Sequence, residues 1–594
     1  MDTNKKPLTN NKETRESLNW IERDIIESRA KGQPIITRFP PEPNGYMHIG
    51  HAKASNLNFR LAQKYGGYMN FRLDDTNPEK EDMHYVEAMV KDLTWLGIKW
   101  QNMYFASDYY EKLYEMAQGL IKKDLAYVDF QTAEQISKTR GNFQTPGIES
   151  PFRNTNPADN LKHFADMRAG KYPDGHCTLR AKIDMSHGHM CMRDPVIYCI
   201  KHTPHYRTGN TWCIYPLYDY AHPLGDAIEG ISHSNCSLEF DNNRALYDWC
   251  IEHAWQDCKF AKETAKFVWA NHPETASTKS KAPLTLAVPR QFEFSRLNIE
   301  QLVMSKRYLK RFVDEGTTDG WDDPRMPTIS GMRRRGYPAS AILDFVESAG
   351  LSRTPMTVPL SALEFYIRSH LDPIATRISV VQNPIKVLIK NYPNAKNEIL
   401  HIENNPHRPE DGKHEITFGK EIYIDGDDFS VAPPPKWKRF MPGGTIRLKG
   451  AYIIKCEKVV TNADGSIAHL ECVYYPNSRS GSDTSGIKPN GVINYVCDGI
   501  AIEINEYAPL LHAGLELTEE NINKDSKRVF VALAEPYARI ACRGEPCEPV
   551  TSSPKPLQFM RKGFYTLDTK SLDKKTNTSN TLVFIKTVGL KEGS

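Results

Sequence analysis

The segment from Thr37 to His51 constrains the fold of this chain more than any other part of the sequence. A Pro/Asn/Gly turn separates the short β-type run Pro34–Phe39 from His48 and His51, which are three residues apart. A strand, a tight turn and a helix start turn backbone N–H groups outward, where they favour negative charge. Histidines at positions i and i+3 lie on one face of a helical turn. The segment therefore predicts an anion-binding helix start, although it matches neither of the common phosphate-loop motifs.

Bulk properties indicate a soluble multidomain protein. The 594 residues, 40% hydrophobic and 25% charged, suggest about four domains. No window approaches 18 uncharged apolar residues, and the polar residues 1–16 lack the apolar core of a signal peptide, so neither a membrane span nor secretion is expected. The 12 cysteines are scattered without a Cys-x-x-Cys pair. This predicts reduced thiols in a cytoplasmic protein, with neither a disulfide framework nor a structural zinc site.

The charge distribution is more informative than the net charge of +3. Basic clusters occur at Lys306-Arg307 with Lys310-Arg311, at Arg333–Tyr337 and at Lys436–Arg439, and the last two include an aromatic residue. Such clusters can neutralise phosphates and stack on unpaired bases. They suggest contacts with nucleic acid, although any one of them could also be a solvated charged face.

The first part of the chain alternates short apolar strands with helical patterns, which predicts βαβ units and a parallel sheet. Ligands of such sheets bind beyond the carboxyl ends of the strands, where the turns after Phe39 and Leu73 would lie. Before the first strand, Ser17–Arg29 is expected to form a helix capped by Ser17.

This rhythm is lost from about Tyr110 to Thr208, which suggests an inserted domain, and the sheet is expected to resume near Thr211. Cys250–Pro289, with a helix-like stretch at Trp255–Trp269 and a polar stretch at Asn271–Pro283, suggests an extra surface insertion to which no function is assigned. Gln291–Leu351 is predicted to be helical.

Beyond about Leu351 the pattern is that of an all-β region, with short strands separated by Pro/Gly/Asn turns every 8 to 12 residues. Asn462–Gly465 is a hairpin signal. We expect two barrels. The predicted strands include Glu421–Ile424, Gly444–Leu448, Ala451–Val460, Ala468–Tyr475 and Val492–Val496.

A second segment gives the helix start a specific meaning. Met304-Ser305-Lys306 lies about 250 residues after His51, and the two segments together resemble the paired signatures of class I aminoacyl-tRNA synthetases. Five segments, in order and spacing, resemble the glutaminyl-tRNA synthetase family, and the resemblance covers nearly the whole chain. These segments are Arg38–His51, Leu73–Pro78, Cys213–Tyr220, Gly230–Ser234 and Gly320–Pro327.

The resemblance implies a multidomain fold that combines α/β and all-β parts. Residues 1–109 and 211–290 would form a Rossmann-type parallel-sheet catalytic domain, with 250–289 as the extra insertion. An inserted acceptor-end-binding domain would occupy 110–210, and a helical subdomain with the Met-Ser-Lys loop 291–350. A proximal anticodon-binding β-barrel would take 351–391 and 497–594, and a distal one 392–496.

The implied activity is ATP-dependent ligation of L-glutamine to tRNA(Gln) through a glutaminyl-adenylate. His48, His51 and Lys306 are expected to stabilise the charge of the triphosphate electrostatically, without a general base. Mg²⁺ should accompany ATP and keep most of its waters, so no protein-bound structural metal is expected. The residues expected to bind ATP are Glu42, Pro43, Asn44, His48, Ile49, Gly50, His51, Ala52, Lys53, Ala54, Ser237, Arg296, Leu297, Met304, Ser305 and Lys306.

Selection of glutamine would depend on hydrogen bonding and charge. By resemblance, Asp74 accepts from the substrate ammonium and Tyr218 contacts the side-chain amide, with Arg38 and Gln291 as second contacts. Glutamyl-tRNA synthetases are expected to carry an arginine where this chain has the uncharged Cys236, and a buried substrate carboxylate without a cation would be costly. The alternatives are a glutamate-charging or non-discriminating relative, and a non-catalytic RNA-binding protein.

For tRNA, the resemblance places acceptor-stem contacts at Asp241 and Asn242, where the family's acidic residue is shifted or replaced. Lys436 and Lys449 depart from the family pattern. A monomer is expected. The other positions expected to contact tRNA are Trp321, Asp322, Asp323, Pro324, Arg325, Met326, Arg377, Arg439, Arg447 and Gln558.

Overall fold

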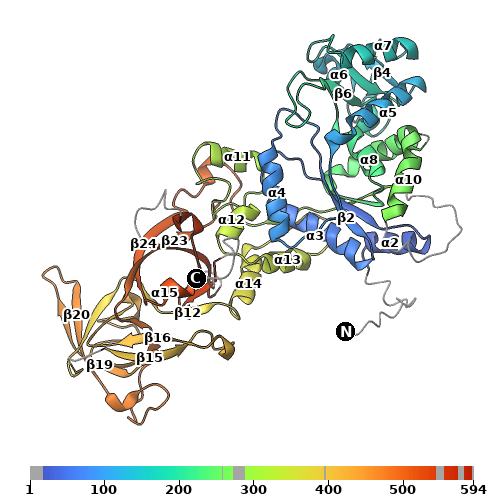
Figure 1. Cartoon of the computed structure of the whole chain (residues 1–594). Helices are drawn as coiled ribbons and strands as arrows, with labels where there is room; N and C mark the ends of the chain where they lie inside the picture. The colour runs from blue at the N-terminus through green and yellow to red at the C-terminus, as the bar shows by residue number, and fades with distance from the viewer. Residues whose placement is uncertain are drawn as a thin grey trace. The chain divides into compact units, whose positions relative to one another are not determined.

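A computed structural model describes residues 18–256, 258–271, 288–393, 397–543, 554–572 and 581–591 of the chain (Figure 1). The chain forms two compact units, each described here by itself. The first comprises Met1–Asn298 with Val346–Thr357, and the second Ile299–Phe345 with Val358–Ser594. In the described ranges, every helix is too short or too polar to pass through a bilayer.

The first helix, α2 (Trp20–Ala30), is capped by Asn19 and not by the predicted Ser17. The Asn19 side chain accepts from the backbone N–H of Glu22 at 3.0 Å, and the Glu22 carboxylate accepts from the backbone N–H of Asn19 at 3.3 Å. This reciprocal pair satisfies two donors that a helix start leaves without partners, which is why the helix begins at Trp20. The polar residues 1–16 lie outside the described residues.

A parallel sheet of order β1-β2-β3 forms the centre of the first unit. Strands β1 (Ile36–Phe39), β2 (Tyr68–Leu73) and β3 (Met103–Phe105) are joined by α3 (Ile49–Lys64) and α4 (Met83–Trp95). A second parallel pair consists of β8 (His233–Ser237) and β9 (Arg290–Phe294). Ser232 connects the two groups, since its N–H donates to the carbonyl of Ile36 at 2.9 Å. The predicted Rossmann-type parallel sheet is confirmed.

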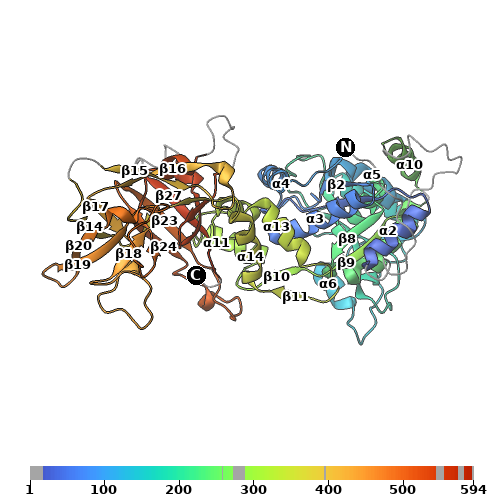
Figure 2. The same cartoon turned by 90° about the horizontal axis from the view of Figure 1, so that it is seen from below.

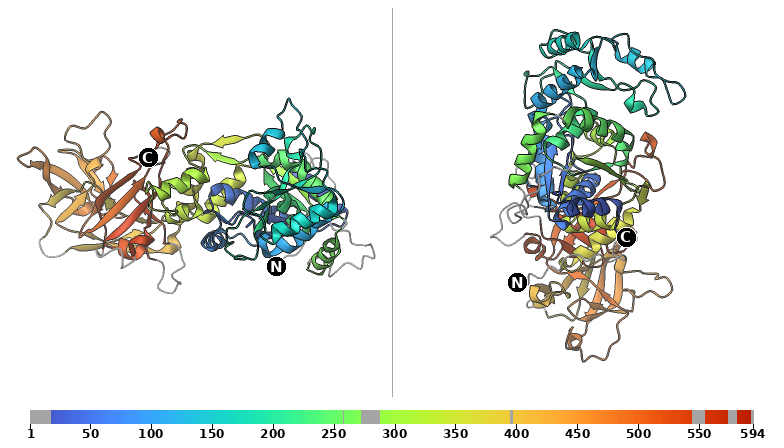
Figure 3. Two further views of the ribbon diagram at one scale, coloured as in Figure 1. Left: turned by 90° about the horizontal axis from the view of Figure 1, so that it is seen from above. Right: turned by 90° about the vertical axis from the view of Figure 1, so that its right-hand side faces the viewer.

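The inserted part, in blue to teal in Figure 3, contains both helices and strands. Its strands form an antiparallel sheet of order β4-β5-β6-β7. The prediction that the parallel sheet resumes near Thr211 is wrong. Strand β7 instead pairs with β6 and completes the antiparallel sheet. Parallel pairing resumes only at β8. The elements are α5 (Tyr110–Lys122), β4 (Ala126–Asp129), α6 (Ala133–Thr139), α7 (Pro157–Arg168), β5 (Thr178–Ala181), β6 (Val196–Ile200) and β7 (Ile214–Pro216).

After β7 the first unit continues with α8 (Tyr218–Ile228), α9 (Arg244–Cys250), a π-helical turn (Ile251–Trp255) and α10 (Lys259–Asn271). Helix α10, within the predicted insertion, contacts the end of α8: the Thr264 hydroxyl donates to the carbonyl of Ile228 at 3.0 Å. Residues 272–287, which include most of the predicted polar stretch, lie outside the described residues.

The segment predicted to be helical from Gln291 to Leu351 begins instead with strands. Its first residues belong to β9 and β10 (Leu297–Ile299), because alternating side chains such as Phe292 and Phe294 suit a strand beside β8. Helices follow at α11 (Lys306–Asp314), α12 (Ile329–Arg334) and α13 (Ala339–Ser348), and then come β11 (Met356–Val358) and α14 (Leu360–Leu371). Helix α14 was not predicted, although Leu363, Ile367 and Leu371 recur at helical spacing and are buried.

The rest of the second unit consists mainly of β-structure, as predicted, with two seven-stranded sheets (Figure 2). The proximal sheet has the order β12-β25-β26-β27-β23-β24-β13. It contains β12 (Thr376–Ile378), β13 (Val380–Val381), β23 (Ile500–Tyr507), β24 (Lys527–Ala534), β25 (Leu557–Phe559), β26 (Gly563–Leu567) and β27 (Leu582–Gly589). The short helix α15 (Ala538–Ala541) follows β24.

The distal sheet has the order β21-β18-β19-β20-β14-β17-β22. The predicted hairpin at Asn462–Gly465 joins β19 to β20, with Gly465 at φ +84°. Of the predicted strands, Val492–Val496 is split in two, and the others are found within two residues. The distal elements are β14 (Ile385–Ile389), β17 (Glu421–Ile424), β18 (Thr445–Leu448), β19 (Ile453–Thr461), β20 (Ile467–Tyr474), β21 (Val492–Ile493) and β22 (Tyr495–Val496), next to the separate hairpin β15 (Glu398–Glu403) and β16 (Lys413–Phe418).

Candidate active site

The start of α3 brings the two motif histidines together. The Nδ1 atom of His48 accepts from the backbone N–H of Gly50 at 3.1 Å, and Nδ1 of His51 accepts from the backbone N–H of His48 at 3.0 Å. The ring centroids are 3.9 Å apart, which confirms that both rings share one face. Because each Nδ1 is an acceptor, a neutral ring carries its proton on Nε2. These two reciprocal hydrogen bonds, which cap the start of α3, therefore set the orientation and the tautomer of both histidines.

The turn before α3 is tied to the end of β2. The carbonyl of Pro41 accepts from the backbone N–H of Asp74 at 3.0 Å, and the carbonyl of Pro43 accepts from that of Asp82 at 3.1 Å. Within the turn, the Asn44 amide donates to the Glu42 carboxylate. The parallel register, with Phe39 opposite Phe71, brings the two strand ends to one edge of the sheet. The histidine turn and Asp74 are thus neighbours, as the sequence predicted.

The residues that follow in α3 divide between solvent and core. Ile49 and Ala52 are fully buried, while Gly50 and Ala54 are partly exposed. Lys53 is also buried, and its ammonium donates to the carbonyl of Ser295 at 3.3 Å. This ammonium contacts the connection between β9 and β10, a location that does not follow from the motif.

Glu239 brings Ser237 and Arg296 together. The Ser237 hydroxyl donates to the Glu239 carboxylate at 3.1 Å, and the Arg296 guanidinium forms an ion pair with the same carboxylate. Next to Arg296, Leu297 is buried. The two predicted ATP contacts thus share one acidic partner.

Met304, Ser305 and Lys306 belong to the second unit, where Ser305 is the N-cap residue of α11 and Lys306 its first residue. His48 and His51 belong to the first unit, and the approach of Lys306 to them is a prediction.

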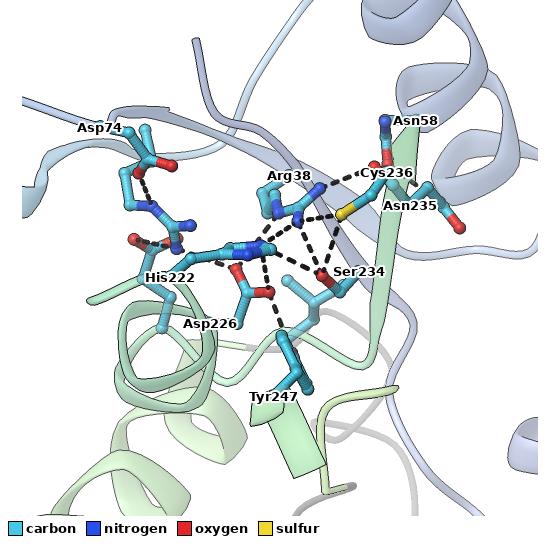
Figure 4. A network of polar contacts seen from close by, with 12 residues as sticks. Arg38, Asn58, Asp74, His222, Asp226, Ser234, Asn235, Cys236 and Tyr247 are labelled. Carbon is cyan, nitrogen blue, oxygen red and sulfur yellow. Dashed lines mark hydrogen bonds and ion pairs between the residues drawn. The ribbon is translucent and has the colours of Figure 1, made fainter. Parts of the chain in front are cut away.

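Arg38, on β1, lies at the centre of a buried polar network (Figure 4). Its guanidinium donates to the Asp226 carboxylate at 3.2 Å and to the Asn235 carbonyl at 2.8 Å. It also donates to the Ser234 hydroxyl at 2.7 Å and the Cys236 sulfur at 3.2 Å, and it contacts His222. The guanidinium is fully buried. Arg38 therefore organises this buried network, and its donors already have protein partners.

A second arginine, Arg72, connects this network to Asp74. Its guanidinium donates to Asp74 at 2.6 Å, to Asp226 at 2.9 Å and to Glu229 at 3.2 Å. Gly225 of α8 leaves room for it, since a Cβ there would lie 3.1 Å from the guanidinium. One oxygen of Asp74, Oδ2, is buried without a hydrogen-bond partner. Such an atom requires an explanation, and a substrate ammonium is the partner predicted for it.

Charge in the network shifts several pKa values. Burial raises the pKa of Asp226, but Arg38, His222 and Arg72 outweigh burial and hold it well below its usual range. Burial lowers the pKa of His222, but Asp226 and Cys236 raise it to about 9. For Cys236, Arg38 and His222 overcome burial and lower the thiol pKa to about 7. The network thus favours an imidazolium beside a partly ionised thiol.

Tyr218 and Gln291 lie beside the same network. The Tyr218 ring stacks on His222 with centroids 4.9 Å apart, and burial, Cys236 and Asp74 raise its pKa. Gln291 lies opposite Ser234 on the neighbouring strand. Its amide donates to the carbonyl of Phe240 at 2.9 Å. The structure therefore gathers Arg38, Asp74, Tyr218, Cys236 and Gln291, the five positions predicted from the sequence.

The predicted tRNA contacts of the first unit lie in the 3-10 segment Leu238–Asn243. Asp241 is 3.9 Å from the Arg244 guanidinium, and the carbonyl of Asn242 accepts from the Cys191 thiol at 2.9 Å. The segment directly follows β8, which carries Cys236. The segment therefore lies only a few residues along the chain from Cys236 and its network.

In the second unit, the segment from Trp321 to Met326 is held by its own contacts. Asp323 is buried and forms an ion pair with Arg325 at 2.6 Å. Asp322 is 2.6 Å from the Lys570 ammonium. Pro324 and Met326 are buried. Only Trp321 and Asp322 are more exposed, so the buried members of this segment support its backbone conformation.

Two predicted anticodon contacts meet at one cavity. Arg377 and Gln558 are opposite each other in the parallel pair of β12 and β25. Both line a cavity of about 650 Å³, together with Lys449 and Asn494. Lys449, which departs from the family pattern, thus lies beside two predicted contacts. Arg439 and Arg447 form ion pairs with Asp428 and Asp483, respectively.

Several members of this network were not predicted from the sequence: Arg72, His222, Asp226, Glu229 and Tyr247. Asp226 bonds to Arg38 and Arg72, and its other oxygen accepts from the Tyr247 hydroxyl at 3.0 Å. A signal was present, since Arg72 lies between Phe71 and Leu73, and Asp226 is on the apolar helix α8. Charged residues inside apolar elements are rarely buried unless they are paired.

Comparison with known proteins agrees with this geometry. The family model "tRNA synthetases class I (E and Q), catalytic domain" matches residues 34–285 and 280–373, and the model of the anti-codon binding domain of the same family matches 375–475. The glutamine–tRNA ligase of Clostridium perfringens is 44% identical over 97% of this chain and 98% of that protein. The corresponding ligase of Clostridium kluyveri is 43% identical over 97% of each.

A parallel sheet with a histidine-capped helix start, followed by an anticodon-binding domain, defines a class I aminoacyl-tRNA synthetase. Within that class, the chain belongs to the E and Q family of tRNA synthetases, enzymes that use ATP to attach an amino acid to tRNA.

Proposed function

We propose that this protein ligates L-glutamine to tRNA(Gln), using ATP and releasing AMP and diphosphate through a glutaminyl-adenylate. The relatives that match almost the whole chain are named glutamine–tRNA ligases. The observation that carries the choice of amino acid is the pairing of the buried Arg38 and Arg72 with carboxylates.

The charges of the pocket favour a neutral substrate side chain. Arg38, Arg72 and a protonated His222 face three carboxylates, those of Asp74, Asp226 and Glu229. Burial raises the pKa of Glu229 to about 7, and the Cys236 thiol beside these groups is partly ionised. The network therefore holds no surplus positive charge for a glutamate side chain, and a buried charge without a partner is costly. A glutamine amide adds no charge. The Tyr218 hydroxyl is proposed to contact this amide, and Oδ2 of Asp74 to accept from the substrate ammonium.

The ATP-binding residues are proposed in the same way. Nε2–H groups of His48 and His51 would donate to the triphosphate at the helix start, and the Lys306 ammonium would follow the charge that develops on it. The turn residues Glu42, Pro43 and Asn44, with Ser237 and Arg296, would hold the rest of the nucleotide. Lys53 would support this wall through Ser295 and not by touching phosphate.

Mg²⁺ would enter with ATP, bound to phosphate oxygens and water. Among the described residues, no group of three or more His, Cys, Asp and Glu side chains is placed to hold a metal ion. The ion would screen the triphosphate charge. No step assigned to the residues of this chain depends on it.

The proposal also covers the contacts with tRNA and the oligomeric state. We propose a cytoplasmic monomer, in which the segment at Asp241 and Asn242 meets the acceptor end and the cavity at Arg377 and Gln558 meets the anticodon. Sedimentation of the purified protein with and without tRNA would test the monomer.

A charging assay tests the ligase. The protein is given ATP, tRNA with a glutamine anticodon, and either labelled glutamine or labelled glutamate. We expect glutamine to be transferred faster, by about 10⁴-fold or more, since mismatched buried polar groups go unpaired. Faster transfer of glutamate would favour the glutamyl-type alternative. Transfer of neither would favour an RNA-binding protein without activity.

A substitution tests the proposed role of Lys306. Lys306→Ala should lower kcat about 10²- to 10³-fold, the usual effect of removing one transition-state donor, and leave tRNA affinity within about twofold. Lys310→Ala, one turn further along α11, is the matched control, because its ammonium already pairs with Asp314 at 2.6 Å. Equal losses of kcat and tRNA affinity in Lys306→Ala would reject the assignment.

A further inference from the structure

Two cysteines face each other in the distal sheet. Cys456 on β19 is directly opposite Cys472 on β20 in an antiparallel pair. The N–H of Cys456 donates to the carbonyl of Gly444 at 3.1 Å, and its carbonyl accepts from the N–H of Gly443 at 2.9 Å. The carbonyl of Cys472 accepts from Lys390 at 2.8 Å. The backbone N–H and C=O of Cys456, and the C=O of Cys472, thus bond to neighbours on the side away from the facing cysteine. Cys456 and Cys472 therefore form a non-hydrogen-bonded pair.

This arrangement suits a covalent bond. In a non-hydrogen-bonded antiparallel pair the Cα atoms are about 4.5 Å apart and the side chains are close. A disulfide requires Cα atoms about 4.4–6.8 Å apart and Cβ atoms about 3.5–4.5 Å apart. Both side chains lie on the buried face, with no exposed surface. A hydrogen bond between the thiols lowers the pKa of Cys456 and raises that of Cys472.

We propose that Cys456 and Cys472 form a reversible thiol/disulfide pair, closed by a hydroperoxide and reopened by a dithiol. The scattered cysteines predict reduced thiols throughout the chain, so this pair would be an exception that strand register creates. Within the same core, Cys497 donates to the carbonyl of Glu421 at 3.4 Å and has a different environment.

The chemistry balances with the peroxide as oxidant. The Cys456 thiolate attacks the peroxide O–O bond and becomes a sulfenic acid, and the alcohol or water leaves. The Cys472 thiol then attacks the sulfenic sulfur, an S–S bond forms, and the S–OH oxygen departs as water with the Cys472 proton. Two thiols and one peroxide give one disulfide, one water and one alcohol, or a second water when the peroxide is H₂O₂.

The neighbouring backbone indicates how a peroxide could reach the two cysteines and what their oxidation would change. The register of β19 and β20 shifts between Cys456 and Lys458, so the regular ladder is interrupted beside the pair, which favours local opening. On the other side, Cys456 bonds to Gly443 and Gly444, which lead into β18 and Arg447. Oxidation should therefore alter the strand that carries a proposed anticodon contact, a consequence that rests on the proposed function.

The experiment uses the full chain. The reduced protein is treated with graded hydrogen peroxide, its free thiols are alkylated, and it is digested without reduction for mass spectrometry. We expect a peptide pair linked through Cys456 and Cys472, released by dithiothreitol. The link should also form in Cys497→Ala, the matched control, and be absent from Cys456→Ala. Recovery of both cysteines as free thiols, at peroxide levels that oxidise the partly exposed Cys191, would overturn the proposal.

Two further measurements distinguish disulfide formation from misfolding of the variants and from failure of the proposed charging activity. Oxidised wild type should unfold at a higher temperature than reduced wild type, and Cys456→Ala should show no such shift; a link without this shift would overturn the proposal. The KM for tRNA should change at least twofold on oxidation and recover with dithiothreitol. An unchanged KM would reject the consequence for tRNA binding, whereas failure of the ligase itself would appear in the reduced protein.

Discussion

The buried network around Asp226 and the cavity beside Arg377 use arginine in opposite ways. Arg38 and Arg72 are fully buried and tied to Asp226, which shares its oxygens among several partners. Arg377, at the cavity, is partly exposed and forms an ion pair with Asp372, whose side chain is 45% exposed. Buried pairs are rigid and costly to break, whereas exposed pairs are worth little and can be exchanged for another anion. The first arrangement suits selection of a small substrate, and the second suits binding of a polyanion.

The largest expected effect comes from breaking the buried hub. Asp226→Asn removes the carboxylate shared by Arg38, Arg72 and His222. Uncompensated buried charge should cost about 3–5 kcal/mol of stability, and charging activity should be lost. Urea unfolding followed by circular dichroism would measure this. Asp124→Asn, which removes an exposed partner of Lys182, is the control and should cost about 1 kcal/mol or less. Similar losses in both variants would contradict the hub.

A smaller effect is expected at the cavity. Arg377→Ala should raise the KM for tRNA about ten- to hundredfold, the range expected for one lost base contact, with kcat and stability nearly unchanged. Charging rates at graded tRNA concentrations would show it. Arg408→Ala, which removes an exposed arginine paired with Glu410, should leave the KM within about twofold. A fall in kcat at constant KM would place Arg377 outside tRNA recognition.

The smallest effect concerns pH and sharpens the contrast within the pocket. The pKa of His222 rises from 6.5 to about 9 on folding, so its stabilisation is full below pH 6.5 and is lost as pH rises toward 9. The pKa of Cys236 falls from 9.0 to about 7, so its stabilisation is present above pH 9 and is lost as pH falls toward 7. In the wild type the two slopes oppose each other between pH 7 and 9.

Cys236→Ser should expose the histidine contribution. Its stability should fall from pH 7 to pH 9 relative to wild type, by on the order of 1 kcal/mol or more. Urea midpoints across this range would measure the slope, and adding His222→Asn should remove it. If the stability of Cys236→Ser instead rose with pH, the proposed electrostatic coupling between His222 and Cys236 would be wrong.

Much of the fold was predictable, because the signals were local. The alternation before α4 predicted the parallel sheet, and Asn462–Gly465 predicted the β19–β20 hairpin. Errors arose where a neighbour decided the outcome. The segment at Gln291 carries no strong strand signal without β8 beside it, and β7 joined the inserted sheet because β6 offered a free edge.

The site was predictable in part. His48 and His51 were paired by helix spacing, and the residues proposed to bind glutamine were identified by resemblance. The partners of those residues were not, because Arg72 and Asp226 are 154 positions apart and their contact depends on how α8 packs on β2. Lys53 shows the same limit, since its ammonium reaches Ser295, which is 242 positions away.

By itself, the sequence determined the features that depend on short spacing: a histidine-capped helix start, the alternation of strands and helices, and the turns of the β-rich half. Backbone geometry sets these within a few residues. Only the tertiary structure decided which buried charges neutralise one another, where Oδ2 of Asp74 is left without a partner, and that Cys456 faces Cys472. Such pairings join distant segments, and the free energy of burying a charge depends on the partners that packing provides.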